Sequence, residues 1–182
     1  MTIPVLETPH LILRPLRADD FADYFEYAQD PAVASSGMWT PYASEEQAHA
    51  DFTHLLTVYA RGLMWWALEE KADGKMIGRC ELDGYDPDDA RADISYALHQ
   101  GYWRRGYVSE AVERVARYGF DDLRLNRLSA TVFPDNIASV RILEKLGMIR
   151  EGCLRQYRST RGAPEDVYLY AVLRAEWQAS HP

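Results

Sequence analysis

Three observations predict an α+β fold for this chain. Residues Asp93–Leu98 alternate polar or small side chains with apolar ones, which is the period of a β-strand. From Val108 the apolar positions follow the helical period instead and form one face, at Ala111, Val112, Val115, Ala116, Phe120 and Leu123. The same two periods recur along the chain, and they predict the element order β-α-α-β-β-β-α-β-α-β-β.

The length and composition are typical of one globular domain. A chain of 182 residues with 47% hydrophobic residues is expected to bury about 70% of the surface that its unfolded form exposes. We therefore expect a single domain over residues 1–182. No apolar run approaches the ~20 residues that span a bilayer, and the N-terminus lacks the basic and apolar regions of a signal peptide. A cytoplasmic protein without a membrane partner is the expectation.

Charge, cysteines and histidines narrow the function classes. The formal net charge of −8 disfavours nucleic acid as a partner and favours cationic acceptors such as amines. Cys80 and Cys153 fall in predicted strands without C-x-x-C spacing, so buried free thiols are expected rather than a disulfide. The five histidines show no H-E-x-x-H or other ligand spacing, and no metal site is expected.

The first elements are a strand, a helix and a loop. The strand is predicted at Leu11–Leu16. Two acidic residues at 19–20 favour a helix N-terminus, and the Asp-Pro pair at 30–31 ends that helix. Ala32–Tyr42 is predicted to be a loop. Its Trp39 and Tyr42 either line an acceptor pocket or pack onto the first helices.

A second helix and a hairpin follow. Ser44 and Gln47 have the spacing of a capping box, so a helix is expected to begin there and to end at Gly62. Strands are predicted at 63–69 and 75–82, joined by a turn at Asp73-Gly74. Trp65 and Trp66 point to opposite faces of this sheet, and one of them is expected in the core. The acidic segment 83–91 is predicted to be a solvated loop, which also suits a cationic acceptor.

The remaining elements complete the sheet. A strand at 127–133 precedes a helix at 136–146, which Gly147 closes as the residue after its C-cap. Segments 148–157 and 164–173 are predicted to form a terminal antiparallel pair.

The turn between the central strand and its helix is basic and contains a glycine. The first N–H groups of a helix have no intrahelical partner and carry partial positive charge, so a phosphate docks there. Gly106 permits close approach of the backbone, Arg104 and Arg105 add charge, and Ser109 is a candidate cap or hydroxyl donor. An ordinary strand–helix connection with solvated arginines is the alternative interpretation.

Two common phosphate motifs are excluded. Gly101-x4-Gly106 has the spacing of a P-loop, but Tyr107-Val108 stands where Lys-Ser/Thr is required. The sequence also has no G-x-G-x-x-G, so the pattern favours neither a nucleoside triphosphate nor a dinucleotide.

A second motif, Asp135–Met148, gives these observations a family context. Asn136, Ser139 and Glu-Lys-Leu-Gly at 144–147 together with Trp103-Arg-Arg-Gly-Tyr-Val108 resemble the GNAT superfamily of acyl-CoA-dependent N-acetyltransferases. The resemblance is to the branch of ribosomal-protein alanine acetyltransferases (RimJ/RimL-like). Gly106 matches the glycine of the family pattern Gln/Arg-x-x-Gly-x-Gly/Ala, whereas Val108 departs from its last position. The resemblance spans nearly the whole chain, and only 31–62 lacks a distinctive match.

The resemblance implies a fold and a cofactor site. The family's sheet is mixed and mostly antiparallel, carries helices on both faces, and is splayed between the strands expected at 93–98 and 127–133. The pantetheine arm of acetyl-CoA enters that gap as a pseudo-strand. The residues implied in cofactor binding are Ala97, Leu98, His99, Arg104, Arg105, Gly106, Tyr107, Val108, Ser109, Asn136 and Ser139.

The implied reaction is direct acetyl transfer from acetyl-CoA to a primary amine in a ternary complex. The amine attacks the thioester carbonyl, and a backbone N–H near residues 97–99 is expected to stabilise the oxyanion. Glu81 and Asp93 are the candidate bases, each with a structural or substrate-orienting role as the alternative, and His99 is a further candidate. Ser139 is the candidate side chain near the departing sulfur, with a backbone hydrogen bond in the helix as the alternative. Asn136 is implied in contacts with the pantetheine amides.

The acceptor stays open at this stage. A peptide or protein N-terminal α-amine is the first expectation, because its pKa near 8 leaves about a tenth of it uncharged at neutral pH. A polyamine or an aminoglycoside is the alternative within the same chemistry. A non-catalytic acyl-CoA-binding regulatory module is the alternative from another class. Edge strands of this fold can pair across a dimer axis, which leaves a homodimer open.

Overall fold

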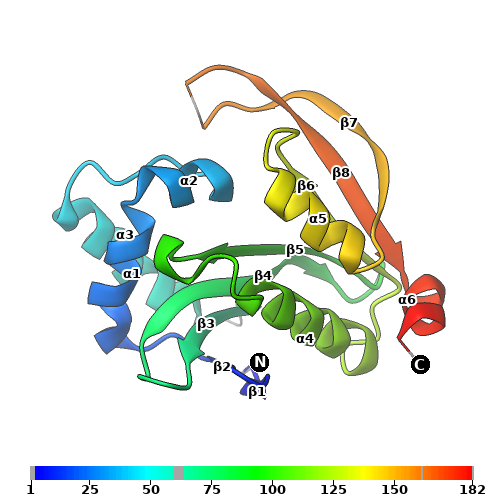
Figure 1. Ribbon diagram of the computed structural model, residues 1–182, viewed down its shortest axis with the longest axis horizontal. Helices are drawn as coiled ribbons and strands as arrows, with labels where there is room; N and C mark the ends of the chain where they lie inside the picture. The colour runs from blue at the N-terminus through cyan, green and yellow to red at the C-terminus, as the bar shows by residue number, and fades with distance from the viewer. Residues whose placement is uncertain (1–2, 60–63, 161, 182) are drawn as a thin grey trace.

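The computed structural model describes residues 3–59, 64–160 and 162–181 (Figure 1). The predicted α+β class is confirmed. Along the chain the elements are β1 (Leu6–Glu7), β2 (Leu11–Arg14), a 3-10 turn at Ala18–Asp20, α1 (Phe21–Ala28), α2 (Pro31–Gly37), α3 (Glu45–Tyr59), β3 (Met64–Glu70), β4 (Met76–Asp86), β5 (Arg91–Leu98), a 3-10 turn at Gln100–Tyr102, α4 (Tyr107–Asp121), β6 (Arg127–Val132), α5 (Ile137–Lys145), β7 (Ile149–Arg158), β8 (Glu165–Leu173) and α6 (Arg174–Ser180).

The strands of the described residues form one open sheet in the order β1-β2-β3-β4-β5-β6-β8-β7. All neighbouring strands are antiparallel except β5 and β6. That parallel pair is matched only at Arg91↔Arg127, Ala92↔Leu128 and Asp93↔Ser129. Beyond this point β5 continues to Leu98 and β6 to Val132 without pairing to each other. The predicted splay between these two strands is therefore present.

Helices cover both faces of the sheet, and each face has its own apolar cluster. Helices α4, α5 and α6 pack on one face, where Trp66 belongs to the larger cluster. Helices α1, α2 and α3 pack on the other, where Trp65 belongs to the smaller one. The two tryptophans face opposite sides of the sheet, as expected, and both rather than one of them lie in a core, with exposed fractions of 1% for Trp65 and 0% for Trp66. Neighbouring strand residues face opposite sides, and here both sides are covered.

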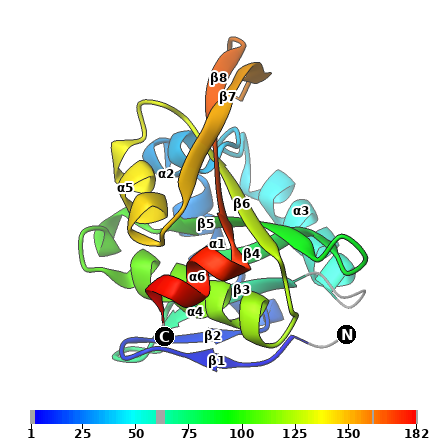
Figure 2. The ribbon, with the colours of Figure 1, turned by 90° about the vertical axis from the view of Figure 1, so that its right-hand side faces the viewer.

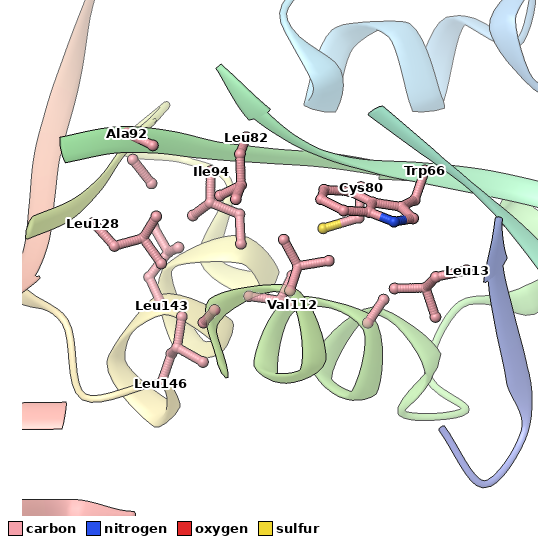
Figure 3. Close-up of a cluster of buried hydrophobic side chains, with 14 of the residues drawn as sticks. Leu13, Trp66, Cys80, Leu82, Ala92, Ile94, Val112, Leu128, Leu143 and Leu146 are labelled. Atoms are coloured by element: carbon pink, nitrogen blue, oxygen red, sulfur yellow. The ribbon is translucent and has the colours of Figure 1, made fainter. Parts of the chain in front are cut away.

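Helix α4 is the main support of the larger cluster (Figure 3). Val112 on this helix faces Leu82 and Ile94 of the central strands, and Leu143 of α5 lies beside them. The apolar face predicted for this helix is buried, apart from Leu123, which is half-buried. Because the helix is packed along its length, the position of its N-terminus relative to β5 is set by the core.

Residues 31–37 are helical, which corrects the loop predicted at Ala32–Tyr42. The Asp-Pro pair that ends α1 also starts α2: the Asp30 carboxylate accepts a hydrogen bond from the N–H of Ala32 (2.8 Å), and Pro31 occupies the first helical position. Met38, at φ +65°, then ends the helix. The segment from Trp39 to Tyr42 is irregular, as expected.

The acidic segment 83–91 is mostly strand rather than loop. β4 continues through Asp86 and β5 begins at Arg91, so only residues 87–90 form the turn. Asp83 pairs with Asp93 across the two strands. The acidic residues of this segment were predicted to be solvated, but the pairing of β4 with β5 places the first of them, Asp83, within the sheet.

Several smaller expectations have clear outcomes. Ser44 Oγ accepts from the N–H of Gln47 (3.2 Å), which confirms the predicted cap of α3, whereas Gly62 lies outside the described residues. Cys80 is buried and free as expected, but Cys153 is exposed, because β7 is an edge strand with little cover. Strand β1 and helix α6 were not predicted. Across the described ranges, no helix is long and apolar enough to cross a bilayer.

The terminal hairpin β7–β8 projects from the body of the molecule, and its tip lies over α2 (Figure 2). Thr40 Oγ1, in the loop after α2, donates a hydrogen bond to the carbonyl oxygen of Thr160 at this tip (3.4 Å). The hairpin and α2 therefore border the space above the gap between β5 and β6.

Candidate active site

Two cavities meet where β5 and β6 separate. The first, of about 420 Å³, is lined by the C-terminal half of β5, the turn at 102–106, the first turn of α4 and one face of α5, and we call it the helix-end cleft. The second, of about 310 Å³, is lined by β4, β5, β6, the end of α2 and the β7 residues Tyr157 and Arg158, and we call it the carboxylate pocket. Ser36, Tyr96, Asn136 and Ser139 line both.

Gly106 forms the N-cap of α4 with φ +86°, in the left-handed region that glycine adopts without strain. The first hydrogen bond of the helix runs from the N–H of Glu110 to Gly106 O (3.1 Å). The N–H groups of the three preceding residues, Tyr107, Val108 and Ser109, are thus at the end of the helix and available to an anion. Of the two roles considered for Ser109, the structure excludes the cap, because Ser109 is the third helical residue and no side chain caps the N-terminus. Its role as a hydroxyl donor stays a prediction.

The two arginines of the turn differ in orientation. Arg104, which also has a positive φ of +63°, is exposed and lines the helix-end cleft. Arg105 instead donates from Nη2 to Gly101 O (3.2 Å) and lies over the ring of Tyr102, 5.0 Å from its centroid. Arg105 does not line the cleft in this structure, so only Arg104 of the pair faces it.

His99 is likewise turned away from both cavities. Its N–H donates to Ile77 O (2.7 Å), its Nδ1 accepts from the N–H of Gly101 (3.0 Å), and its Nε2 lies 3.1 Å from Glu26 Oε1. These contacts make His99 a part of the backbone turn. The neighbouring Ala97 and Leu98 do line the cleft, as expected.

Asn136 and Ser139 stand at the start of α5. Asn136 Oδ1 accepts from the N–H of Ser139 (3.1 Å) and caps the helix, while Nδ2 donates to Ser36 O (3.4 Å). Ser139 is therefore held through its backbone, and it lines both cavities at their junction. The hydroxyl of Tyr96, on β5, donates a hydrogen bond to the carbonyl oxygen of Ser139 (3.5 Å).

Three carboxylates line the carboxylate pocket, two on β4 and one on β5. Glu81 is 7% exposed and accepts a hydrogen bond from Ser95 Oγ (2.6 Å). The same hydroxyl lies 3.0 Å from Asp83 Oδ2. Asp93 is exposed and accepts from Ser129 Oγ on β6. The two carboxylates on β4 thus share a single hydroxyl proton.

Burial changes the acidity of this group. Desolvation, together with the negative charge of Glu81, raises the pKa of Asp83 to about 6. Arg79 lies next along β4 on the same face, with Nε 3.5 Å from Glu81 Oε1. Burial disfavours the charge of Arg79, but the surrounding Glu81, Tyr27 and Tyr24 more than offset that effect, and its pKa is raised.

Arg79, Asp83 and Ser95 were not singled out in the sequence. The period of a β-strand is the pattern that could have identified them. Residues 79, 81 and 83 alternate along β4, and residues 93 and 95 alternate along β5, so all five face the same side of the sheet. The signal was lost because the segment after Leu82 was assigned to a loop. In the described ranges, no group of three or more His, Cys, Asp or Glu side chains is arranged to hold a metal ion.

A family model for the acetyltransferase (GNAT) domain matches residues 10–149. The chain belongs to the GNAT family. It is 32% identical over 173 residues to the uncharacterized N-acetyltransferase p20 of Bacillus licheniformis, covering 94% of this chain and 97% of that protein. The ribosomal-protein-serine acetyltransferase of Escherichia coli is 27% identical over 128 residues, 70% of this chain and 71% of that one.

Solved structures agree with this assignment. A GCN5-related N-acetyltransferase from Brucella melitensis superimposes with a TM-score of 0.81 at 27% identity, covering 97% of this chain and 81% of that one. The GNAT resemblance of the sequence is thereby confirmed. As a GNAT protein with N-acetyltransferase relatives, the chain is an acetyl-CoA-dependent N-acetyltransferase.

Replacing Gly106 with valine is expected to weaken CoA binding by about tenfold or more. A β-branched residue is disfavoured at φ +86°, and relaxation of the turn moves the N–H groups of the helix end. Gly74→Val is the matched control: it has φ +72° and, as at Gly106, no neighbouring atom within 4 Å of an added Cβ, but lies in the β3–β4 turn. Calorimetry with CoA measures both variants, and equal affinities would contradict the assignment.

Proposed function

We propose that this GNAT protein acetylates the α-amino group of a peptide or protein N-terminus by direct attack in a ternary complex. The observation that carries the proposal is the junction of the two cavities at Tyr96 and Ser139. One cavity offers the positive end of a helix, and the other offers a row of carboxylates. An anionic acyl carrier and a cationic amine are thus bound on opposite sides of one opening. Of the relatives, the ribosomal-protein-serine acetyltransferase acts on a protein acceptor.

The residues of the helix-end cleft fit CoA. The N–H groups at 107–109 and the side chain of Arg104 suit a diphosphate, and Gly106 keeps the backbone accessible. The walls of the cleft from Tyr102 to Ile142 are largely apolar, which suits a pantetheine arm. When bound, acetyl-CoA supplies the activated acetyl group as a thioester. Asn136 retains one amide N–H and one lone pair of its oxygen for the pantetheine amides, since its oxygen accepts once in capping α5 and its nitrogen donates once to Ser36 O.

The oxyanion donor expected near residues 97–99 narrows to the backbone N–H of Leu98. His99 N–H is already engaged with Ile77 O. In an antiparallel ladder, successive residues direct their N–H groups to alternate sides, so the N–H of Leu98 points away from β4. That direction leads into the gap, because β5 has no partner there. The Leu98 carbonyl is separately satisfied by the indole Nε1 of Trp103 (2.8 Å).

The carboxylate pocket supplies the base. Of the three candidates from the sequence, Glu81 is buried beside the junction, Asp93 is exposed and hydrogen bonded to Ser129, and His99 lines neither cavity. Asp83 is a further candidate. Its pKa of about 6 leaves it mostly ionised at neutral pH yet more basic than an ordinary aspartate. We propose that Glu81 and Asp83, joined through Ser95, accept the proton that the neutral amine releases as it attacks the thioester.

Ser139 is proposed as the donor that protonates the departing thiolate. It lines the junction, and its backbone is fixed by the Asn136 cap. A small-molecule polyamine remains the second candidate acceptor, because three carboxylates in one pocket suit a polycation. A regulatory acyl-CoA-binding module would need the helix-end cleft alone and would tolerate loss of every polar side chain at the junction.

A panel of amines distinguishes these functions. With acetyl-CoA at pH 7, release of free thiol is expected to be faster with an alanyl tripeptide amide than with spermidine. The difference in uncharged amine alone contributes about a hundredfold in kcat/KM, since the two amines have pKa values near 8 and 10.4. Faster thiol release with spermidine would instead support a polyamine as the acceptor. CoA binding without thiol release for any amine would support the regulatory module.

Replacing Ser139 with alanine is expected to lower kcat about tenfold to a hundredfold near pH 7, without changing CoA affinity. The deficit is expected to shrink above pH ~8.5, where a thiolate leaves without a proton. Ser139→Thr keeps a hydroxyl and is expected to recover most of kcat. Stopped-flow thiol release over pH 6.5–9.5 is the measurement, and a deficit independent of pH would rule out the acid role.

Replacing Asp83 with asparagine is expected to change the pH dependence of kcat/KM. In the wild type, the logarithm of kcat/KM rises with slope 2 below pH ~6, where both Asp83 and the amine must lose protons, and with slope 1 up to the amine pKa near 8. Asp83→Asn is expected to show slope 1 throughout and lower values above pH 6. Asp89→Asn, in the β4–β5 turn, is the control that keeps both slopes.

The same substitution has an expected effect on stability. The pKa of Asp83 is raised from 3.8 in the unfolded chain to about 6 in the folded protein. The folded state then binds more protons between these values, so its stability falls as pH rises through that window. Asp83→Asn removes this loss and is expected to raise the urea midpoint at pH 7.5. A lower midpoint would contradict the raised pKa.

A further inference from the structure

A third cavity, of about 210 Å³, lies beside the carboxylate pocket. Its walls come from α1, α3, the irregular segment after α2, and β4, and aromatic rings line much of it. We call it the aromatic pocket and define it by Tyr24, Tyr27, Trp39, Tyr42 and Arg79. Arg79 lines both this pocket and the carboxylate pocket, so the two are adjacent.

Two polar atoms of the aromatic pocket are buried without a hydrogen-bond partner among the residues that the structure describes. They are the hydroxyl of Tyr27, a residue that is 1% exposed, and Nε of Arg79. An unpaired buried donor costs about 1–3 kcal/mol. Other polar groups of the pocket are paired nearby: the hydroxyls of Tyr24 and Tyr42 are 2.7 Å apart, and Trp39 Nε1 donates to Ala28 O (3.0 Å). The pocket lining therefore includes two groups that lack a hydrogen-bond partner within the described ranges.

Arg79 is held in place by its neighbours. Its guanidinium lies 5.1 Å from the ring centroid of Trp39 and 6.0 Å from that of Trp65. Glu81 approaches Nε at 3.5 Å, which is ion-pair distance but longer than a hydrogen bond. Aromatic faces attract a guanidinium and restrict its rotation. An oriented guanidinium thus lines the space next to the proposed amine site.

The charges around these two donors determine what kind of ligand group can accept their hydrogen bonds. Nε of an arginine only donates, so its partner must be an acceptor such as oxygen. A second cation is disfavoured beside Arg79, and a carboxylate is disfavoured beside Glu81 and Asp83. A neutral carbonyl oxygen satisfies the donors without either repulsion.

On the basis of the function proposed above, we propose that Arg79 and Tyr27 bind the first carbonyl oxygen of the acceptor. The aromatic pocket is then the subsite that recognises a neutral aminoacyl group, as at a peptide N-terminus. The amine lies among the carboxylates of β4, and the adjoining carbonyl lies toward Arg79. A polyamine has no oxygen for these donors, and a free amino acid brings a carboxylate, so both bind less well.

The test uses Tyr27→Phe, which removes one hydroxyl and keeps the ring. Calorimetry with CoA-saturated protein measures the affinity of an alanyl tripeptide amide and of 2-aminobutane, an amine with a similar branched carbon but no carbonyl. The variant is expected to bind the peptide about tenfold more weakly, while its affinity for 2-aminobutane changes less than twofold. Tyr118→Phe is the matched control, because Tyr118 packs against Trp66 at the α4 face of the sheet and is expected to change neither affinity.

Three outcomes would overturn the inference: unchanged peptide affinity in Tyr27→Phe, equal weakening of both amines, or wild-type protein that binds the peptide no more tightly than 2-aminobutane. Thiol release tests the proposed function separately. A peptide that binds through Tyr27 but releases no thiol would contradict the function and support the subsite. Peptide turnover that Tyr27→Phe leaves unchanged, with unchanged affinity, would support the function and contradict the subsite.

Discussion

The separation of β5 from β6 is the constraint on which the site depends. The two strands pair over three residue pairs and then diverge, which leaves the backbone groups of β5 beyond Asp93 that point toward β6 without a strand partner, although β4 pairs with the other edge. Unpaired backbone groups in a sheet are costly unless a side chain, water or ligand satisfies them. The indole N–H of Trp103 donates a hydrogen bond to the carbonyl oxygen of Leu98. The N–H groups on the same edge of β5 face the opening. The gap therefore exposes a free edge of β5 with which an extended ligand can pair, and both large cavities lie along it.

Coverage of both sheet faces assigns the two reactants to different environments. Odd-numbered residues of β4 from Arg79 to Asp83 face α1–α3, where polar side chains collect beside aromatic ones. Even-numbered residues such as Cys80 and Leu82 face α4 and build the core that fixes the helix end. A single strand thus lines the carboxylate pocket on one side and supports α4 and the helix-end cleft on the other. This alternation explains how buried carboxylates lie within a few residues of a continuous apolar cluster.

Some features were predicted from local pattern alone. The start of α4 at the glycine turn of residue 106 and the closing Gly147 follow from rules that involve neighbours within a turn or two. Residues 31–37 were missed because the Asp-Pro pair has two interpretations: it ends one helix and caps the next. The end of β4 was missed because its acidic composition resembles a solvated turn, whereas pairing with β5 overrides that preference.

By itself the sequence determined the family, most of the element order and the glycine turn that opens α4, since these depend on short motifs and on periodicity. Only the tertiary structure decided which side chains line the carboxylate pocket and the aromatic pocket. Strand register brings Ser95 between Glu81 and Asp83, and helix packing places Tyr27 beside Arg79, 52 positions along the chain. Such contacts join residues that are far apart in sequence. Their burial, and with it the acidity of Asp83, exists only once the elements have packed.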